Sequence, residues 1–310
     1  MTITKAKEEF LFHCTYEKNL SEKTIKAYTI DLDQFIVWLE SADQASTSVC
    51  DVDKKILRTF IRTLYRYKSY KTIKRKLATL KAFFAYHEFE DNILISPFRK
   101  LRIKLKMPQR LPRTMSLQEI KKILAKVYAK RMGCSPGGYK EFSILRDLVI
   151  LEMLFTTGAR VSEICNLNIK DLDTKRWRVR IIGKGDKERT LYICNEETKK
   201  SIREYLSLRI DGHSPALFIN RLNKRISDQS IRNMVKKYAL EVGIDRNITP
   251  HVFRHSFATI MLEEGVDVRY IQSFLGHRSI STTQIYAHVN EKQQQKIIKT
   301  KHPRRNFQMI

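Results

Sequence analysis

The chain has 310 residues, and its 59 Lys and Arg against 33 Asp and Glu give a formal net charge of +26. Its hydrophobic content of 42% excludes a disordered basic tail, because that many apolar side chains can form packed cores, and the length favours two domains. No apolar run reaches the roughly 18 residues of a membrane span, and the first residues lack the apolar segment of a signal peptide, so we expect a soluble, cytoplasmic protein.

The positive charge is unevenly distributed along the chain. Its size indicates a polyanionic partner. Residues 1–53 carry 5 basic and 10 acidic residues, whereas 54–113 carry 18 and 3, and 114–310 carry 36 and 20. Nucleic acid is the first candidate partner. A membrane surface is the second, although the basic residues are spread over folded-looking segments rather than one amphipathic helix. The five cysteines are scattered without a CxxC pair, which argues against a disulfide framework and a structural zinc site.

The first hundred residues are predicted to form helices. Apolar residues recur at spacings of three and four after Ser21, a plausible N-cap, and again in two later segments. The three buried stripes are Ile25, Tyr28, Leu32, Phe35, Ile36 and Leu39; Ile56, Leu57, Phe60, Ile61 and Leu64; and Ile73, Leu77, Leu80, Phe83 and Phe84. This pattern is typical of a small helical bundle.

One side of this bundle is predicted to bind DNA. Only 3 acidic residues accompany the 18 basic ones over 54–113, and a solvated basic face is the alternative. The segment 97–113 has three prolines, seven basic residues and no helical stripe, which indicates an interdomain linker that runs along phosphate backbone. The DNA-contacting residues that we expect are Lys71, Lys74, Arg75, Lys81, Arg102, Lys104 and Lys106.

A second, mostly helical domain begins after the linker. Ser116 and Glu119 form a capping-box pattern ahead of a helix. The clear strand signal is WRVRII at 177–182, where apolar and basic residues alternate, and residues 190–193 return as its partner. The sequence after about residue 196 is again typical of helix. The chain is therefore predicted to be mainly α with a small antiparallel β-sheet (α+β).

A first candidate phosphate-binding pair lies in the segment TPHVFRH. Thr249 and Pro250 predict the N-terminus of a helix, a position that favours anions. His251 and Arg254 are three residues apart and lie on one face there, and a guanidinium presents a fork that suits two phosphate oxygens. The alternative is a surface histidine and an ion-paired arginine. His255 is expected to point elsewhere on the helix, in a structural role.

A second arginine, Arg160, lies in the segment TGARVSE. Gly158 ends the preceding apolar helix, and Glu163, three residues after Arg160, could fix the orientation of the guanidinium. A plain Arg–Glu helix pair is the alternative. Lys184 stands between two glycines at the tip of the predicted hairpin, either as a lysine that reaches into a groove or as a solvated turn residue.

Two further residues follow a short helix that is predicted to end at Gly276. His277 comes directly after this glycine, and Tyr286 follows nine residues later. Taken alone, Tyr286 is typical of an ordinary core or surface aromatic rather than of a nucleophile.

In chain order, these candidates are Arg160, Lys184, His251, Arg254, His277 and Tyr286. The ordered set resembles the signature of the tyrosine recombinase (phage integrase) family. TTGARVSEI resembles its first-arginine box, HVFRHSFAT its His-x-x-Arg box, and FLGHRSISTTQIYAH the box that joins the second histidine to the nucleophilic tyrosine. The compact length resembles Xer-type recombinases and the small integrases of mobile elements. The resemblance implies a SAM-like N-terminal core-binding domain at residues 1–103, a linker at 104–113 and a tyrosine-recombinase catalytic domain at 114–310.

The resemblance also implies cleavage of a DNA phosphodiester. Arg160 and Arg254 would neutralise the non-bridging oxygens, where charge builds in the transition state. Tyr286 would attack the phosphate and leave a 3′-phosphotyrosyl bond and a free 5′-hydroxyl. Lys184 would protonate the departing 5′ oxygen as general acid.

Three residues have supporting roles in this implied mechanism. His251 and His277 would add hydrogen bonds to the same phosphate, and His251 would assist as general base toward the tyrosine. Glu163 would hold the arginine. No metal and no cofactor are implied, because the arginines replace a metal clamp.

The implied partner is double-stranded DNA with a specific core site. It would be bound by a homotetramer, or by a heterotetramer with a second recombinase, that passes through a Holliday junction; integration, excision and Xer-type dimer resolution all use one such active site. A helix at 291–299 would offer Ile297 and Ile298 to a neighbour's pocket, with a frayed basic tail as the alternative. The alternative functions are a type IB topoisomerase-like relaxing enzyme and a non-catalytic DNA-binding protein on the same scaffold.

Overall fold

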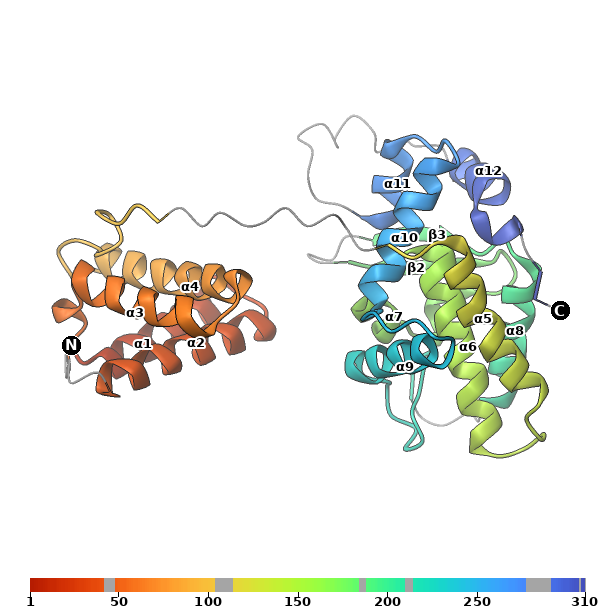
Figure 1. Cartoon of the computed structure of the whole chain (residues 1–310), viewed down its shortest axis with the longest axis horizontal. Coiled ribbons are helices and arrows are strands. Elements are labelled where there is room, and N and C mark those ends of the chain that lie inside the picture. The colour runs from red at the N-terminus through yellow and green to blue at the C-terminus, as the bar shows by residue number, and fades with distance from the viewer. Residues whose placement is uncertain are drawn as a thin grey trace. The chain divides into compact units, whose positions relative to one another are not determined.

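The computed structural model describes residues 1–41, 48–103, 114–183, 188–209, 214–276, 291–306 and 308–309. These residues form two compact units, Met1–Arg110 and Leu111–Ile310 (Figure 1). The residues that we assign to the linker, 104–113, lie outside the described residues, and Lys104 and Lys106 lie there with them.

The described part of the first unit is a bundle of helices. They are α1 (Ile3–Phe12), α2 (Glu22–Ser41), α3 (Lys54–Tyr67) and α4 (Tyr70–Phe89), with a π-helical turn at His13–Glu17 and a 3-10 turn at Val49–Asp51. The three predicted apolar stripes lie on α2, α3 and α4, and their residues are buried or half-buried. Phe10 of α1 packs edge-on against Phe83, with ring centroids 5.6 Å apart. α1 therefore joins the same core, although none of the predicted stripes includes it.

A buried ion pair links α2 to α4. Asp31 is 1% exposed and accepts a hydrogen bond at 2.9 Å from Nζ of Lys76, which is 2% exposed. Thr79 Oγ1 donates to the same carboxylate at 3.0 Å, and Arg75 donates to it from a half-exposed position. Because neither buried charge is hydrated, loss of one partner would leave the other uncompensated.

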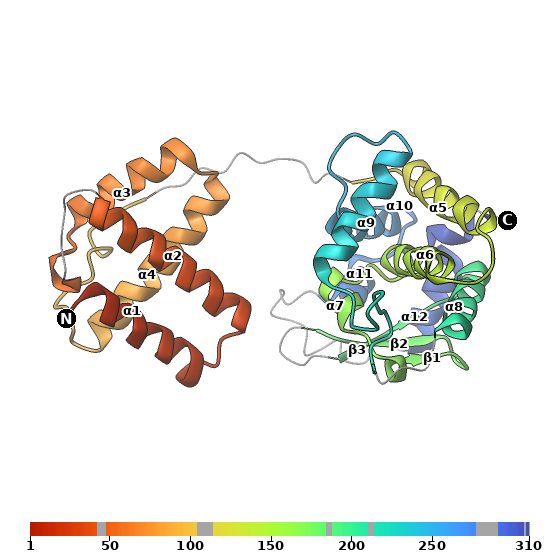
Figure 2. The ribbon, with the colours of Figure 1, turned by 90° about the horizontal axis from the view of Figure 1, so that it is seen from below.

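The second unit is built around α6 (Tyr139–Thr157), which Figure 2 shows almost end-on in the middle of the unit. Residues 148–157 of α6 are all buried, as expected for a helix that is apolar on every side. The other helices described in this unit are α5 (Leu117–Met132), α7 (Val161–Asn166), α8 (Glu196–Leu208), α9 (Asp228–Glu241), α10 (Pro250–Glu263), α11 (Val268–Leu275) and α12 (Glu291–Lys301), with 3-10 turns at Ile169–Asp171 and Pro303–Asn306. The predicted capping box is present, because Ser116 and Glu119 each bond the other's backbone N–H at the start of α5.

A small antiparallel sheet belongs to the same unit. Its strands β1 (Leu172–Asp173), β2 (Arg178–Ile182) and β3 (Glu188–Tyr192) pair in that order. Val179 and Ile181 are buried, and Arg180 between them is exposed, so the alternation seen in the sequence is that of a half-buried strand. A mainly helical chain with a small antiparallel sheet confirms the predicted fold class.

The strand boundaries differ slightly from the prediction. Trp177 lies outside β2 because its backbone is in the left-handed region, with φ +53°, and its ring lies under the Arg203 guanidinium, 4.8 Å from the ring centroid. β3 begins before Thr190, since Glu188 already pairs with Ile182. The sequence does not predict β1, because two residues are too few to show a period of two.

The C-terminal segment packs against its own unit. Ile298 of α12 is 6% exposed within the core of this unit, and Ile297 is half-buried against that core. Arg304 is 1% exposed, and its Nη2 lies 2.8 Å from Glu152, a fully buried residue of α6. The expectation that both isoleucines are available to a neighbour is therefore wrong for this structure, because the buried ion pair anchors the segment on the unit to which it belongs.

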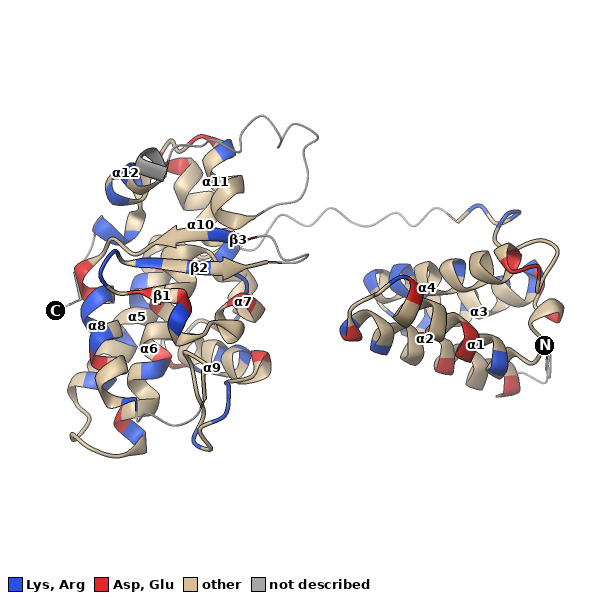
Figure 3. Cartoon of the chain, turned by 180° about the vertical axis from the view of Figure 1, so that it is seen from behind, with Lys and Arg blue, Asp and Glu red and all other residues tan. Residues whose placement is uncertain are grey.

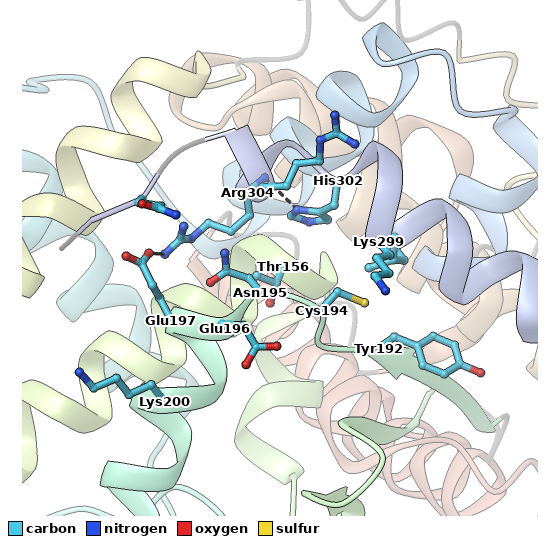
Figure 4. A pocket seen from close by; sticks show the side chains of 13 residues that line it. Thr156, Tyr192, Cys194, Asn195, Glu196, Glu197, Lys200, Lys299, His302 and Arg304 are labelled. Carbon is cyan, nitrogen blue, oxygen red and sulfur yellow. Dashed lines mark hydrogen bonds and ion pairs between the residues drawn. The ribbon is translucent and has the colours of Figure 1, made fainter.

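A pocket of about 480 Å³ lies beside this anchor, between the segment and the start of α8 (Figure 4). Arg304 also donates to Glu197 at its wall, at 2.6 Å. His302 is buried between Phe155 and Phe257, with ring centroids 5.4 and 5.6 Å away. Its Nδ1 accepts the backbone N–H of Arg304 at 3.0 Å, and burial, followed by the charge of Arg304, lowers the pKa of His302 to about 3.

The described ranges contain neither a membrane-spanning helix nor a metal-binding cluster. Within those ranges, every helix is too short or too polar to cross a membrane. The same ranges contain no group of three or more His, Cys, Asp and Glu side chains that could hold a metal ion.

Candidate active site

Five elements of the second unit bring charged side chains together. The end of α6, the start of α7, the first turn of α10, the end of α11 and strand β3 converge on Glu163 and on the carbonyl groups that end α11. Of the predicted catalytic set, Arg160, His251 and Arg254 lie in the described residues, as does Glu163. Lys184, His277 and Tyr286 lie outside them.

Gly158 makes the turn that places Arg160. It caps α6 in the left-handed conformation, with φ +60°, which glycine adopts without strain. A Cβ at this position would lie 2.6 Å from Cδ1 of Phe257, closer than packed carbon atoms approach. The next helix, α7, begins directly after Arg160, which occupies the N-cap position in extended conformation. The backbone turn therefore requires glycine both for its dihedral angle and for space.

Glu163 holds Arg160 by two hydrogen bonds, as the sequence predicts. The backbone N–H of Arg160 donates to Oε2 at 2.8 Å, and its Nη1 donates to Oε1 at 2.7 Å. The Glu163 side chain is 5% exposed, whereas that of Arg160 is 39% exposed. The carboxylate thus fixes the orientation of a guanidinium that still faces solvent.

Arg189 of β3 is a member of this cluster that the sequence does not identify. Its Nη1 and Nη2 donate to Oε1 and Oε2 of Glu163 at 3.0 and 2.7 Å, a bidentate pairing. Its Nε donates to the carbonyl oxygen of Phe274 at 2.8 Å. In the sequence Arg189 is one of several arginines on the hairpin and has no local feature that separates it from Arg180.

Arg254 is buried at the centre of the cluster. It is 4% exposed, and its Nη1 and Nη2 donate to the carbonyl oxygens of Gly158 at 2.9 Å and of Leu275 at 2.6 Å. Burial, followed by the positive charge of Arg160, lowers the pKa of Arg254 to about 10. The guanidinium therefore stays charged at neutral pH, although its partners are uncharged carbonyl groups.

The carbonyl groups at the end of α11 accept hydrogen bonds from all three guanidiniums. Phe274 O accepts from Arg189, Leu275 O from Arg254, and Gly276 O from Nη2 of Arg160 at 3.3 Å. Carbonyl groups at a helix C-terminus have no partner within the helix and form the negative end of its dipole. This end of α11 is thus a natural acceptor for cations, and it holds the three arginines close to one another.

The cluster carries a positive charge that favours an anion. Burial alone would raise the pKa of Glu163, but the hydrogen bonds and charge of Arg189, followed by the contacts of Arg160, hold that pKa below its usual range. The carboxylate is therefore ionised and neutralises one of the three guanidiniums. The excess of two positive charges and the exposed edge of Arg160 fit a phosphate group, which guanidinium forks bind through two oxygens.

His251 lies at the start of α10, as predicted, but His255 does not point away from it. The Nε2 atoms of the two imidazoles are 3.0 Å apart, and both residues are exposed. The expectation for His255 is wrong because residues four apart share a helix face. A proton shared between the two rings would make one the donor and the other the acceptor.

The predicted DNA-contacting residues of the first unit differ in their surroundings. Lys71, Lys74 and Lys81 are exposed on α4, and Arg102 is exposed after it. Arg75 is half-exposed and already engaged by Asp31. Lys and Arg recur along both α3 and α4 (Figure 3). The basic surface of this unit therefore extends beyond α4.

Two family models match the chain. The model described as "Phage integrase family" matches residues 114–293, and the one described as "Phage integrase, N-terminal SAM-like domain" matches residues 8–90. The first alone spans more than half of the chain and includes every residue of the arginine cluster.

Known proteins and solved structures are similar over most of the chain. A tyrosine recombinase of Agathobacter rectalis is 42% identical over 303 residues, which cover 96% of each chain. A tyrosine recombinase XerC of Thermodesulfovibrio yellowstonii is 36% identical over 303 residues, or 95% of each chain. The XerH recombinase bound to its difH substrate shares the fold at 22% identity, with a TM-score of 0.67 over 94% of this chain and 83% of that one. A lambda integrase dimer bound to a COC′ core site shares it at 15% identity, with a TM-score of 0.69 over 90% and 96%. The chain therefore belongs to the phage integrase family of tyrosine recombinases.

Proposed function

We propose that this site-specific recombinase cuts and rejoins duplex DNA at a core site, with the arginine cluster as the binding site of the scissile phosphate. The observation that carries the proposal is the convergence of Arg160 and Arg254 on the end of α11, with Glu163 fixing Arg160. Two guanidiniums held in advance can stabilise charge as it builds on the non-bridging oxygens, without reorganisation during the reaction.

The proposed cleavage step is a transesterification at phosphorus. The Tyr286 hydroxyl loses its proton to His251 and attacks the phosphate, so that a phosphorus–tyrosine oxygen bond forms at the 3′ side. The bond to the 5′ oxygen breaks, and Lys184 gives that oxygen a proton. His277 donates a hydrogen bond to the phosphate. Atoms and charge balance without an external energy source, because one phosphoester replaces another.

The phosphotyrosyl bond allows strand exchange. A 5′-hydroxyl from a second duplex attacks it, the tyrosine is released, and a Holliday junction forms after the first pair of exchanges. Such exchange needs two synapsed sites and four active sites, so we propose a homotetramer on DNA, or a heterotetramer with a second recombinase. XerH is bound to its difH substrate and lambda integrase to a COC′ core site in those structures, which supports duplex DNA as the partner.

The first experiment traps the covalent intermediate. A nicked duplex that carries the target site loses a short 5′-hydroxyl fragment after cleavage, so that religation fails and the adduct accumulates. The wild-type chain is expected to form a protein–DNA adduct in EDTA, and the Tyr286→Phe variant is expected to bind the same DNA without forming one. Tight binding with no adduct from the wild-type chain on its true site would contradict the catalytic proposal and leave a DNA-binding protein.

A second measurement distinguishes recombination from relaxation. On a plasmid that carries two target sites, a recombinase gives exchanged products, whereas a type IB topoisomerase-like enzyme relaxes any supercoiled plasmid without them. Relaxation of a plasmid that lacks the site would contradict site-specific recombination.

A further inference from the structure

Arg189 uses all three nitrogens of its guanidinium within the cluster. Two of them bind Glu163, and the third binds the carbonyl oxygen of Phe274. The Arg189 side chain is only 12% exposed, so it offers no free edge to a substrate. Its contacts instead join β3, the start of α7 and the end of α11. Those elements flank Arg160, and β3 and α11 also border the segments that carry Lys184 and His277 in the sequence.

We infer that Arg189 is a positioning residue, which holds Arg160 in the phosphate-binding orientation by fixing Glu163 and the end of α11. The inference rests on the proposed function of the arginine cluster. Without Arg189, the Glu163 carboxylate keeps only its bonds to Arg160, and Phe274 O loses the donor that ties α11 to the sheet. Gly276 is part of this packing, since a Cβ there would lie 3.1 Å from Nη1 of Arg189.

Arg180 supplies a matched control on the same hairpin. It lies on β2 and forms an ion pair with Asp171, whose side chain is 5% exposed, at 2.8 Å. In the sheet, Arg180 pairs with Thr190 and Arg189 pairs with Ile181, so the two arginines are neighbours in register. Both bind a buried carboxylate, yet only Arg189 contacts Glu163 and α11. A general effect of removing a sheet arginine would therefore appear equally in both variants.

The test combines single-turnover cleavage with a double-mutant cycle. Arg189→Gln, Arg189→Lys and Arg180→Gln are compared on the nicked substrate at saturating protein, with DNA affinity and thermal unfolding measured beside the rate. We expect both Arg189 variants to cleave about 100-fold more slowly, the loss typical of one misplaced transition-state donor. We expect the DNA affinity of all three variants to stay within about threefold of the wild-type value. The cleavage rate of Arg180→Gln is expected to stay within the same limit, because neither quantity depends on the orientation of Arg160.

The cycle asks whether Arg189 acts through Arg160. If it does, Arg189→Gln adds little further loss in an Arg160→Ala background, because the group that it positions is already absent. A merely structural role predicts the full loss in both backgrounds. Full additivity, or wild-type cleavage by Arg189→Gln, would overturn the inference. If Arg189→Gln unfolds, Arg189→Lys in the same cycle decides, since it keeps the charge but not the three-point geometry.

Failure of this inference is distinguishable from failure of the proposed function. An adduct from the wild-type chain, with Arg189 variants that match it, removes the positioning role alone. No adduct from the wild-type chain removes the proposed cleavage itself, and the variants then carry no information.

Discussion

Gly158 forms the backbone turn that precedes Arg160 in the candidate active site. Its backbone turn requires φ +60°, and a Cβ would contact the Phe257 ring at 2.6 Å. For Gly158→Ala we expect the free energy of unfolding to fall by about 2–4 kcal/mol, since strain from the left-handed conformation adds to overpacking. Urea denaturation measures the loss. Cleavage by the folded fraction is expected to fall as well, because Arg160 follows this turn.

Gly265→Ala separates the two causes. Gly265 has a similar φ, +73°, but nothing lies within 4 Å of the added Cβ. We expect a loss of only about 1–2 kcal/mol, the conformational cost alone. Equal losses in the two alanine variants would show that the Phe257 contact has no energetic consequence.

The charge and the shape of the Arg254 side chain both bear on the cleavage rate that we expect. Because burial and Arg160 lower its pKa only to about 10, the guanidinium stays protonated as the pH rises from 7 to 9 and loses its charge only above that range. A lysine would carry the charge but could not reach both Gly158 O and Leu275 O. Arg254→Lys is therefore expected to slow cleavage by about 100- to 1000-fold with little change in DNA affinity. Single-turnover cleavage checks this, and a rate within threefold of the wild type would contradict it.

At the level of elements, the buried Asp31–Lys76 ion pair joins α2 to α4. Asp31→Ala is expected to lower the free energy of unfolding by about 3–5 kcal/mol, because a buried ammonium loses its counter-ion. The double variant Asp31→Leu, Lys76→Met removes both charges and is expected to recover most of that loss. Denaturation of the full chain, followed by a probe in the first unit, gives both values. If the double variant is less stable than the single one, packing rather than charge dominates this contact.

The periodic elements were the most predictable from sequence. The stripes on α2, α3 and α4 and the alternation over Val179 and Ile181 repeat a pattern over several turns or residues, and the structure confirms them. β1 is too short to carry a pattern. The fold class follows from such local repeats, since each buried face needs only the residues of its own element.

The candidate site was predictable only in part. Arg160 and Glu163 are three residues apart, so their contact follows from helix geometry. Arg189 contacts Glu163 across 26 positions of the chain. The sequence predicts that α11 ends at Gly276, but it does not predict which side chains bind the carbonyl groups at that end. His255 was placed on the wrong face although the spacing of four was visible. Contacts between distant elements depend on the tertiary fold, which local spacing does not encode.

At the scale of the whole molecule, the buried His302 leads us to expect that docking of the C-terminal segment on the second unit depends on pH. The pKa of His302 is lowered from 6.5 to about 3. The imidazole therefore binds a proton more readily in the released or unfolded segment than in the docked one. Docking is therefore fully favourable above pH 6.5 and weakens as the pH falls below it. Between pH 6.5 and 5 the loss is about 2 kcal/mol. Hydrogen exchange of the amides of 297–306 is expected to accelerate over this range relative to the core of the unit.

His302→Asn is the control for this behaviour. The Asn Oδ1 can replace Nδ1 as acceptor for the backbone N–H of Arg304, but it does not titrate. Its exchange rates are expected to follow only the intrinsic pH dependence of amide exchange. An equal weakening in this variant would assign the effect to another group.

On α11, the three arginines of the cluster bind peptide carbonyl groups and no side chain. Substitutions at Phe274 and Leu275 are thus limited only by the volume that the core allows, because any residue supplies the same carbonyl oxygen. A methionine or isoleucine there should leave the guanidiniums where they are. Residues 274 and 275 can therefore change during evolution without moving the three guanidiniums. Gly276 cannot change in the same way, because its φ is +63° and an added Cβ would lie 3.1 Å from Nη1 of Arg189.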